Sequence, residues 1–175
     1  MTEPASDTSP AIAPGTYRLD PARSVIRADV PAMFGLMTVR GTFRLRSGEV
    51  TVAGDTARSS VRATLDASSF SSGNAIRDRQ VRAASMLDAA AYPEITFAGA
   101  GPTPHGAGWL IPGSVTARGV TVPAELEMSD LRAEAGVIRF HAATTLDRTK
   151  FGATSKMGIV GQTIALSIDA VAVPG

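Results

Sequence analysis

The stretch RDRQVRAASMLDAAAYPEITF, residues Arg77–Phe97, joins a polar segment directly to an alternating one. The polar part predicts a short helix near residues 75–88, with Asn74 in the place of the N-cap. Pro93 disfavours helical geometry at the residue before it, so the helix should end there and a strand should follow over 94–99. Because the apolar residues of the helix form only a thin stripe, we expect it to lie on a sheet.

On both sides of this stretch, apolar and polar residues alternate, which is typical of strands with one buried face. In residues 39–46, for example, Val39, Phe43 and Leu45 alternate with polar residues. Because each strand has one solvent-exposed face and one buried face, a parallel sheet that is buried on both sides is excluded. Turn sequences separate the runs at Ser47-Gly48, Gly54-Asp55, Ser72-Gly73-Asn74, Arg118-Gly119 and Ala135-Gly136. The predicted strands cover roughly 16–30, 37–46, 49–53, 58–69, 94–99, 108–117, 120–129, 136–147 and 160–173.

The composition favours a single domain with its own core, since the chain has 175 residues and 44% of them are hydrophobic. We assign this domain to residues 14–175. Residues 1–13 are rich in Pro, Ser, Thr and Ala without a pattern, and predict a disordered tail. The net charge of +1 and the scattered arginines give no reason to expect binding to nucleic acid or to an anionic membrane. Cysteine is absent from the sequence, which excludes disulfides and thiolate chemistry.

The beginning of the sequence contains neither the basic start nor the apolar stretch of a secretory signal. No apolar run reaches the length that a membrane-spanning helix needs. We therefore expect a cytoplasmic protein without an integral membrane segment.

The pattern of the strands leaves two architectures open, a barrel and a sandwich. Many of the inward residues are small, for instance Ala28, Ala63 and Ala124, and aromatic residues are 5% of the chain. The core of a sandwich needs large side chains from both sheets to reach native packing density. Small residues on the wall of a closed barrel leave a cavity, and closure removes exposed edges. Alternation alone does not decide between the two.

A search for catalytic or metal-binding residues finds little. His105 lies in a Gly/Pro loop and His141 on the polar face of its strand, so we expect both to be solvated. Glu125 and Glu127 share one strand face, but it is the polar one, which is typical of a charged outer surface. The segment FGATSKMGIVG, residues 151–161, lacks the spacing of a phosphate-binding loop. The sequence predicts no catalytic residue, no metal and no cofactor.

Five segments of the chain occur in the order in which one known family carries its motifs. They are an aspartate-led strand, a V-x-G-x-F strand, an Arg-Asp helix that leads into YPEITF, a GVT hairpin and a turn that ends in Phe-Gly. Their positions are Asp20–Ser24, Val39–Phe43, Arg77–Phe97, Gly113–Leu126 and Asp147–Gly152. On these motifs the chain resembles the YceI-like family of polyisoprenoid-binding, lipocalin-like proteins.

This resemblance implies an all-β fold, an eight-stranded antiparallel lipocalin-like β-barrel with one short helix. It also implies non-catalytic binding or carriage of a long-chain isoprenoid or similar amphiphilic lipid inside the barrel. Two alternatives stay open: a ligand-free interaction or stress-response protein with a filled barrel, and an enzyme that acts on a barrel-bound lipid. In such an enzyme, Arg77, Asp78 and Arg148 are the only polar residues suited to act. A homodimer is compatible with each alternative.

Inward apolar residues are the expected lining of the ligand site. The apolar loop 33–37 should form its mouth, where two methionines suit varied tails or a partner protein. Ordinary core packing explains the same inward residues equally well, because a filled small barrel needs them too. The expected lining residues are Met33, Phe34, Leu36, Met37, Phe43, Leu65, Phe97, Leu126, Phe140 and Leu166.

The head group of the ligand is expected to meet Arg23, Arg77, Asp78 and Arg148. Two positions depart from the family pattern: Arg23 stands where many members have a histidine, and Ala32 stands where a second histidine often follows. We also expect Asp78 to accept hydrogen bonds that hold the helix across the barrel wall or one open end.

Overall fold

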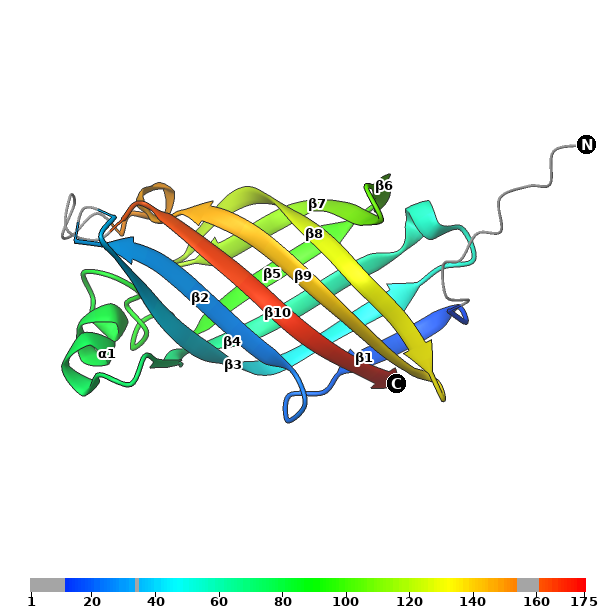
Figure 1. The fold of residues 1–175 in the computed structure, drawn as a ribbon, viewed down its shortest axis with the longest axis horizontal. Helices are drawn as coiled ribbons and strands as arrows, with labels where there is room; N and C mark the ends of the chain where they lie inside the picture. The colour runs from blue at the N-terminus through cyan, green and yellow to red at the C-terminus, as the bar shows by residue number, and fades with distance from the viewer. Residues whose placement is uncertain (1–11, 34, 154–160) are drawn as a thin grey trace, which may run out of the picture.

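Eight strands close into an antiparallel barrel in the computed structural model, which describes residues 12–33, 35–153 and 161–175 (Figure 1). The ring closes because β10 pairs with both β9 and β2. The predicted eight-stranded barrel is therefore confirmed. In ring order the strands are β2 (Val25–Ala32), β3 (Met37–Val52), β4 (Ser60–Ser71), β5 (Glu94–Ala100), β7 (Gly108–Ala117), β8 (Val120–Glu134), β9 (Val137–Asp147) and β10 (Thr163–Pro174).

Strand β1 (Gly15–Leu19) lies end to end with β2, because both strands pair with β10 on one side and with β3 on the other. The prediction of a single strand over 16–30 is wrong, since the chain turns between β1 and β2. The Asp20 carboxylate accepts hydrogen bonds from the backbone N–H of Ala22, at 2.9 Å, and from Arg23 Nε, at 2.7 Å. An aspartate that bonds its own backbone two residues on is a turn former, which ends β1 here.

The break predicted at Ser47-Gly48 is also wrong, because β3 runs through it as one long strand. The register against β4 shifts between Leu45 and Ser47, so the strand carries a bulge rather than a turn. At Gly48 a Cβ atom would lie 2.5 Å from Leu19 Cδ1 and 2.7 Å from the carbonyl oxygen of Arg62. The glycine is thus required by close packing inside the barrel. The other four predicted turns are confirmed.

Helix α1 (Ala75–Arg82) is shorter than the predicted helix. The N-cap prediction is confirmed, since the Asn74 side chain accepts a hydrogen bond from the backbone of Arg77 at 3.0 Å. The helix ends early at Ala83, whose backbone is extended and whose N–H donates to the carbonyl of Gln80, and beyond it the carbonyls of Ala84 and Met86 accept from Arg118. The remaining elements are the short strand β6 (Thr103–His105), which was not predicted, and the 3-10 turns η1 (Thr56–Arg58) and η2 (Arg148–Phe151).

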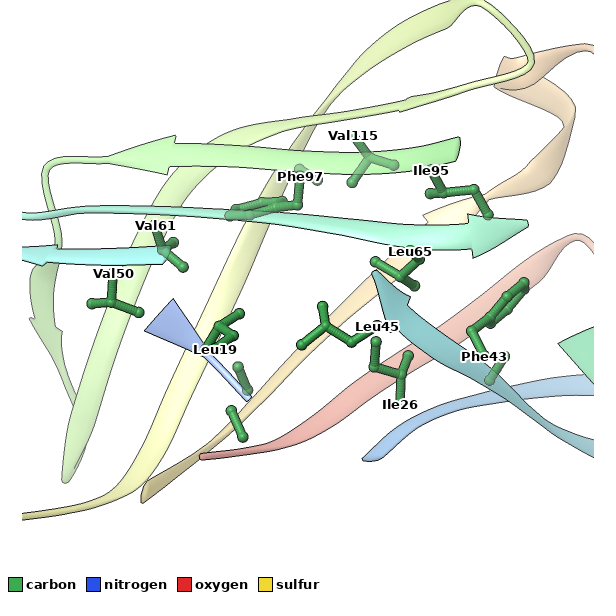
Figure 2. Close-up of a cluster of buried hydrophobic side chains, with 14 of the residues drawn as sticks. Leu19, Ile26, Phe43, Leu45, Val50, Val61, Leu65, Ile95, Phe97 and Val115 are labelled. Carbon is green, nitrogen blue, oxygen red and sulfur yellow. The ribbon is translucent and has the colours of Figure 1, made fainter. Parts of the chain in front are cut away.

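The barrel is filled with large apolar side chains at the end away from α1. Figure 2 shows side chains such as Leu19, Val50 and Val61 pointing into this interior. Their strands place them far from the helix, which follows the other end of β4. The described residues contain no helix that is long and apolar enough to cross a membrane. The predicted tail, residues 1–13, lies almost entirely outside the described residues.

Candidate ligand-binding cavity

A cavity of about 500 Å³ occupies the end of the barrel next to α1. This volume falls within the range of roughly 300–1,000 Å³ that small-molecule sites have. Apolar side chains from β2, β3, β7, β9, β10 and α1 make most of its wall, among them Val30, Val39, Ala117, Leu146 and Ile164. Among the described residues of the lining, those with polar side chains are Asn74, Arg77, Gln80, Arg118 and Arg148.

Six apolar residues line the cavity and also belong to the buried core: Ala28, Phe43, Phe70, Ile95, Val115 and Phe151. The rings of Phe43 and Phe70 are tilted by 56° with their centroids 5.3 Å apart. A Cβ atom at Gly41 would overlap Cε2 of the Phe70 ring, so the missing side chain at Gly41 leaves the space that this ring occupies. The cavity therefore ends about halfway along the barrel, above the filled end.

The predicted lining residues fall into separate groups in the structure. Met33, Met37, Phe43 and Leu166 line the cavity. Leu36 lies beside the mouth, 86% exposed and outside the lining, and Phe34 lies outside the described residues. The other four face the interior without lining the cavity: Leu65, Phe97 and Phe140, which are buried, and Leu126, which is half-buried.

The four predicted head-group residues also separate. Arg77 and Arg148 line the cavity, whereas Asp78 and Arg23 do not. Arg23 is held in the β1–β2 turn by its ion pair with Asp20, at 2.7 Å. Ala32, the position at which the family often has a histidine, lies in the cavity wall.

Arg148 and Arg118 are fixed in place by backbone carbonyls. Arg148 is only 3% exposed, and it donates from Nε to the carbonyl of Gly161 at 2.9 Å and from Nη1 to that of Ala153 at 2.6 Å. Arg118 donates from Nη1 to the carbonyls of Ala84, at 2.7 Å, and Met86. Burial lowers the pKa of the Arg148 guanidinium and the neighbouring Asp147 opposes this shift, yet an arginine keeps its charge at neutral pH.

Asp78 connects α1 to the end of β4. Its carboxylate accepts hydrogen bonds from the backbone N–H of Ser72, at 2.9 Å, and from the Ser72 hydroxyl, at 2.6 Å. The hydroxyl bond is the main cause that lowers the pKa of Asp78, and burial opposes it. Asp78 is buried and turned away from the cavity, so its contacts hold the helix at the mouth.

We predict that Asp78→Ala lowers the melting temperature by several degrees, because it leaves the Ser72 donors without their acceptor. A double-mutant cycle with Ser72→Ala isolates the contact, since the second change should add little once the first is made. The pKa of Asp78 lies below its ordinary value of 3.8 in the folded protein. The stabilisation is therefore fully present above that value and lost as the pH falls through the lower, folded-state pKa.

Melting curves of wild type and Asp78→Ala between pH 7 and pH 2 should accordingly converge in acid. An unchanged melting temperature together with loss of ligand binding would instead make Asp78 a ligand contact.

The two histidines lie on the outer surface. His141 Nδ1 is 2.9 Å from the Asp169 carboxylate, which also pairs with Arg27 at 2.6 Å, and His105 is 3.8 Å from Glu127. Within the described part of the chain, His, Asp and Glu side chains form no group of three that could hold a metal ion.

Comparison with known proteins agrees with this geometry. The model of the YceI-like domain matches residues 17–172. A UPF0312 protein of Vibrio parahaemolyticus is 33% identical over 95 residues, which are 53% of this chain and 50% of that protein. A UPF0312 protein of Enterobacter sp. is 33% identical over 94 residues, 53% of this chain and 49% of that protein. The chain thus matches about half the length of these curated relatives.

Solved structures share the fold. BcnA of Burkholderia cenocepacia has a TM-score of 0.74 at 22% identity, covering 87% of this chain and 98% of BcnA. A polyisoprenoid binding domain from Saccharophagus degradans, implicated in plant cell wall breakdown, has a TM-score of 0.69 at 14% identity, covering 93% of this chain and all of that domain. Because the family model spans nearly the whole barrel, the resemblance seen in the motifs is confirmed, and the chain belongs to the YceI-like domain family.

Proposed function

We propose that this protein binds an amphiphilic lipid with an isoprenoid-like tail, with the tail in the cavity and the head group beside α1. The observation that carries this proposal is the apolar cavity of about 500 Å³, with its polar side chains contributed by α1 and by the two turns at its mouth. The Saccharophagus degradans domain of the same fold, described as polyisoprenoid-binding, supports the same class of ligand.

The energetics suit a tail that makes few hydrogen bonds. Each buried isoprene unit removes ~100 Å² of apolar surface from water, which is worth at most ~2–3 kcal/mol before the costs of association. We propose Met33, Met37, Phe43 and Leu166 as tail contacts. Met33 and Met37 stand half-exposed at the mouth, where flexible thioether side chains adapt to different tails.

We further propose carriage rather than catalysis. Among the residues of the lining that the structure describes, the polar side chains are arginines and amides, with no carboxylate, histidine or hydroxyl group. General acid–base or nucleophilic chemistry needs such a group within reach of the bound molecule.

Native mass spectrometry of the freshly purified protein tests this function. We expect a co-purified hydrophobe, and after its removal we expect one farnesol molecule to bind per chain. Protein that carries no lipid and binds no prenyl compound would overturn the proposal.

A second candidate rests on exposed apolar side chains at the mouth. Leu36 is 86% exposed and Ile76 is 72% exposed. These side chains favour contact with another protein through this end of the barrel. If no lipid binds, this interaction role is the function that the structure supports.

A further inference from the structure

Among the described residues of the cavity lining, the charged ones are three arginines, Arg77, Arg118 and Arg148, and none is acidic. They reach the cavity from α1, from the β7–β8 turn and from η2. Arg118 and Arg148 stand on the same side, since both contact Met86, one at its carbonyl oxygen and the other at its sulfur, 3.8 Å away. From this arrangement we propose that the head group of the ligand is an oxyanion, a carboxylate or a phosphate. The proposal rests on the proposed function.

The acidic neighbours of these arginines in the sequence are occupied elsewhere. Asp78 is bonded to Ser72. Asp147 accepts from the backbone of Thr149, at 2.9 Å, and from the side chain of Gln162, at 2.7 Å. Neither carboxylate lines the cavity, so both reduce the positive potential from outside without filling the head-group position.

Burial strengthens the effect of the arginine charges on the choice of head group. A cation that leaves water for an apolar environment loses hydration, and an opposite charge nearby offsets that loss. A guanidinium matches the two oxygens of a carboxylate or phosphate with two parallel hydrogen bonds, which a single alcohol oxygen cannot reproduce. An ammonium head group would instead meet three like charges.

The carbonyls around the cavity prepare the arginines for this role. Those of Ala153 and Gly161 hold Arg148, and those of Ala84 and Met86 hold Arg118. Because these side chains are ordered before a ligand arrives, binding loses less conformational entropy. Arg77 is half-buried near the start of α1 and completes the site from the helix side.

A series of probes with one tail tests the head group directly. Farnesol, farnesoic acid, farnesyl phosphate and farnesylamine share the same fifteen-carbon chain, so differences in Kd report on the head. We expect the acid and the phosphate to bind about tenfold or more tightly than the alcohol, since charge-assisted hydrogen bonds are stronger than neutral ones. The amine should bind more weakly than the alcohol, and added salt should reduce the preference for the anions.

Arg77→Gln is the informative variant, and Arg79→Gln is its matched control. Arg79 lies on the same helix but is exposed and outside the lining. We expect Arg77→Gln to cut the preference for the anions over farnesol about tenfold, because one charged pair is lost. Arg79→Gln should leave this preference unchanged. Arg118→Gln, with its melting curve recorded, provides a second variant at the β7–β8 turn.

Each remaining outcome overturns one proposal. Equal affinity for farnesol and farnesoic acid, or the same response to Arg77→Gln and Arg79→Gln, would overturn the oxyanion head group and leave prenyl binding standing. Failure of all four probes to bind would overturn the proposed function. Inorganic diphosphate that binds as tightly as farnesyl phosphate would show that the arginines take a free phosphate rather than a lipid head.

Discussion

Val30→Phe and Ala117→Phe should each abolish binding of a farnesyl probe and leave the free energy of unfolding unchanged or slightly raised. Both residues line the cavity, on β2 and β7, which are opposite each other in the eight-stranded ring. A ring placed there fills space that the tail would occupy and buries apolar surface without pushing on packed neighbours. Denaturant unfolding and a binding titration of the same preparations measure the two effects.

Phe140→Trp is the control for these variants. Phe140 lies in the filled interior, outside the cavity lining, so a larger ring there overpacks and should cost ~1–3 kcal/mol. Opposite signs for the two kinds of substitution are expected only where part of the barrel is open. If the phenylalanine substitutions at Val30 and Ala117 also destabilise the protein and wild type binds no lipid, the barrel is a packed core.

Phe70→Ala should destabilise the unliganded protein by ~3–5 kcal/mol and lengthen the tail that it binds. Phe70 is buried, lines the cavity and packs against Gly41 and Phe43, and from these contacts we infer that its ring closes the cavity toward the filled end. Because the cavity has a closed end, wild type should retain a limited range of lengths from a mixture of prenyl alcohols of graded length. Without the ring, the cavity extends toward the filled end, and native mass spectrometry should show longer chains retained.

The matched change is Phe97→Ala. Phe97 is equally buried but lies outside the cavity lining. It should lose a comparable free energy of unfolding, ~3–5 kcal/mol, without any change in the preferred chain length. The same preferred length in wild type, Phe70→Ala and Phe97→Ala would refute the role of Phe70 in closing the cavity.

Much of the fold follows from alternation. Residues such as Phe43 and Leu45 recur with period two because one face of each strand meets the interior, and the structure keeps this phase. Local turn chemistry was harder to interpret. Asp20 ends a strand through bonds of its own side chain, whereas Gly48, which resembles a turn residue, is needed inside a strand to admit Leu19.

The cavity was less predictable than the fold. Alternation shows which side chains face the interior of the barrel, but it does not show where along the barrel axis each side chain lies. Leu65 and Phe43 both face inward, yet only Phe43 is level with the open end. The position of a side chain along the barrel axis depends on the stagger between neighbouring strands, and this stagger is set by pairing between residues that are distant in sequence. Arg118 was missed for the same reason, since its position in the cavity lining depends on the pairing of β5 with β7.

The pairing of β10 also determines when the protein can fold during synthesis. This strand joins β9 to β2 and extends along β1, so the last barrel strand to leave the ribosome closes the ring against the first. Until then the nascent chain holds an incomplete sheet with two free edges, which are templates for pairing with other chains. Contacts so distant in sequence also form slowly. A chain that terminates before Thr163 should therefore aggregate rather than settle into a smaller barrel.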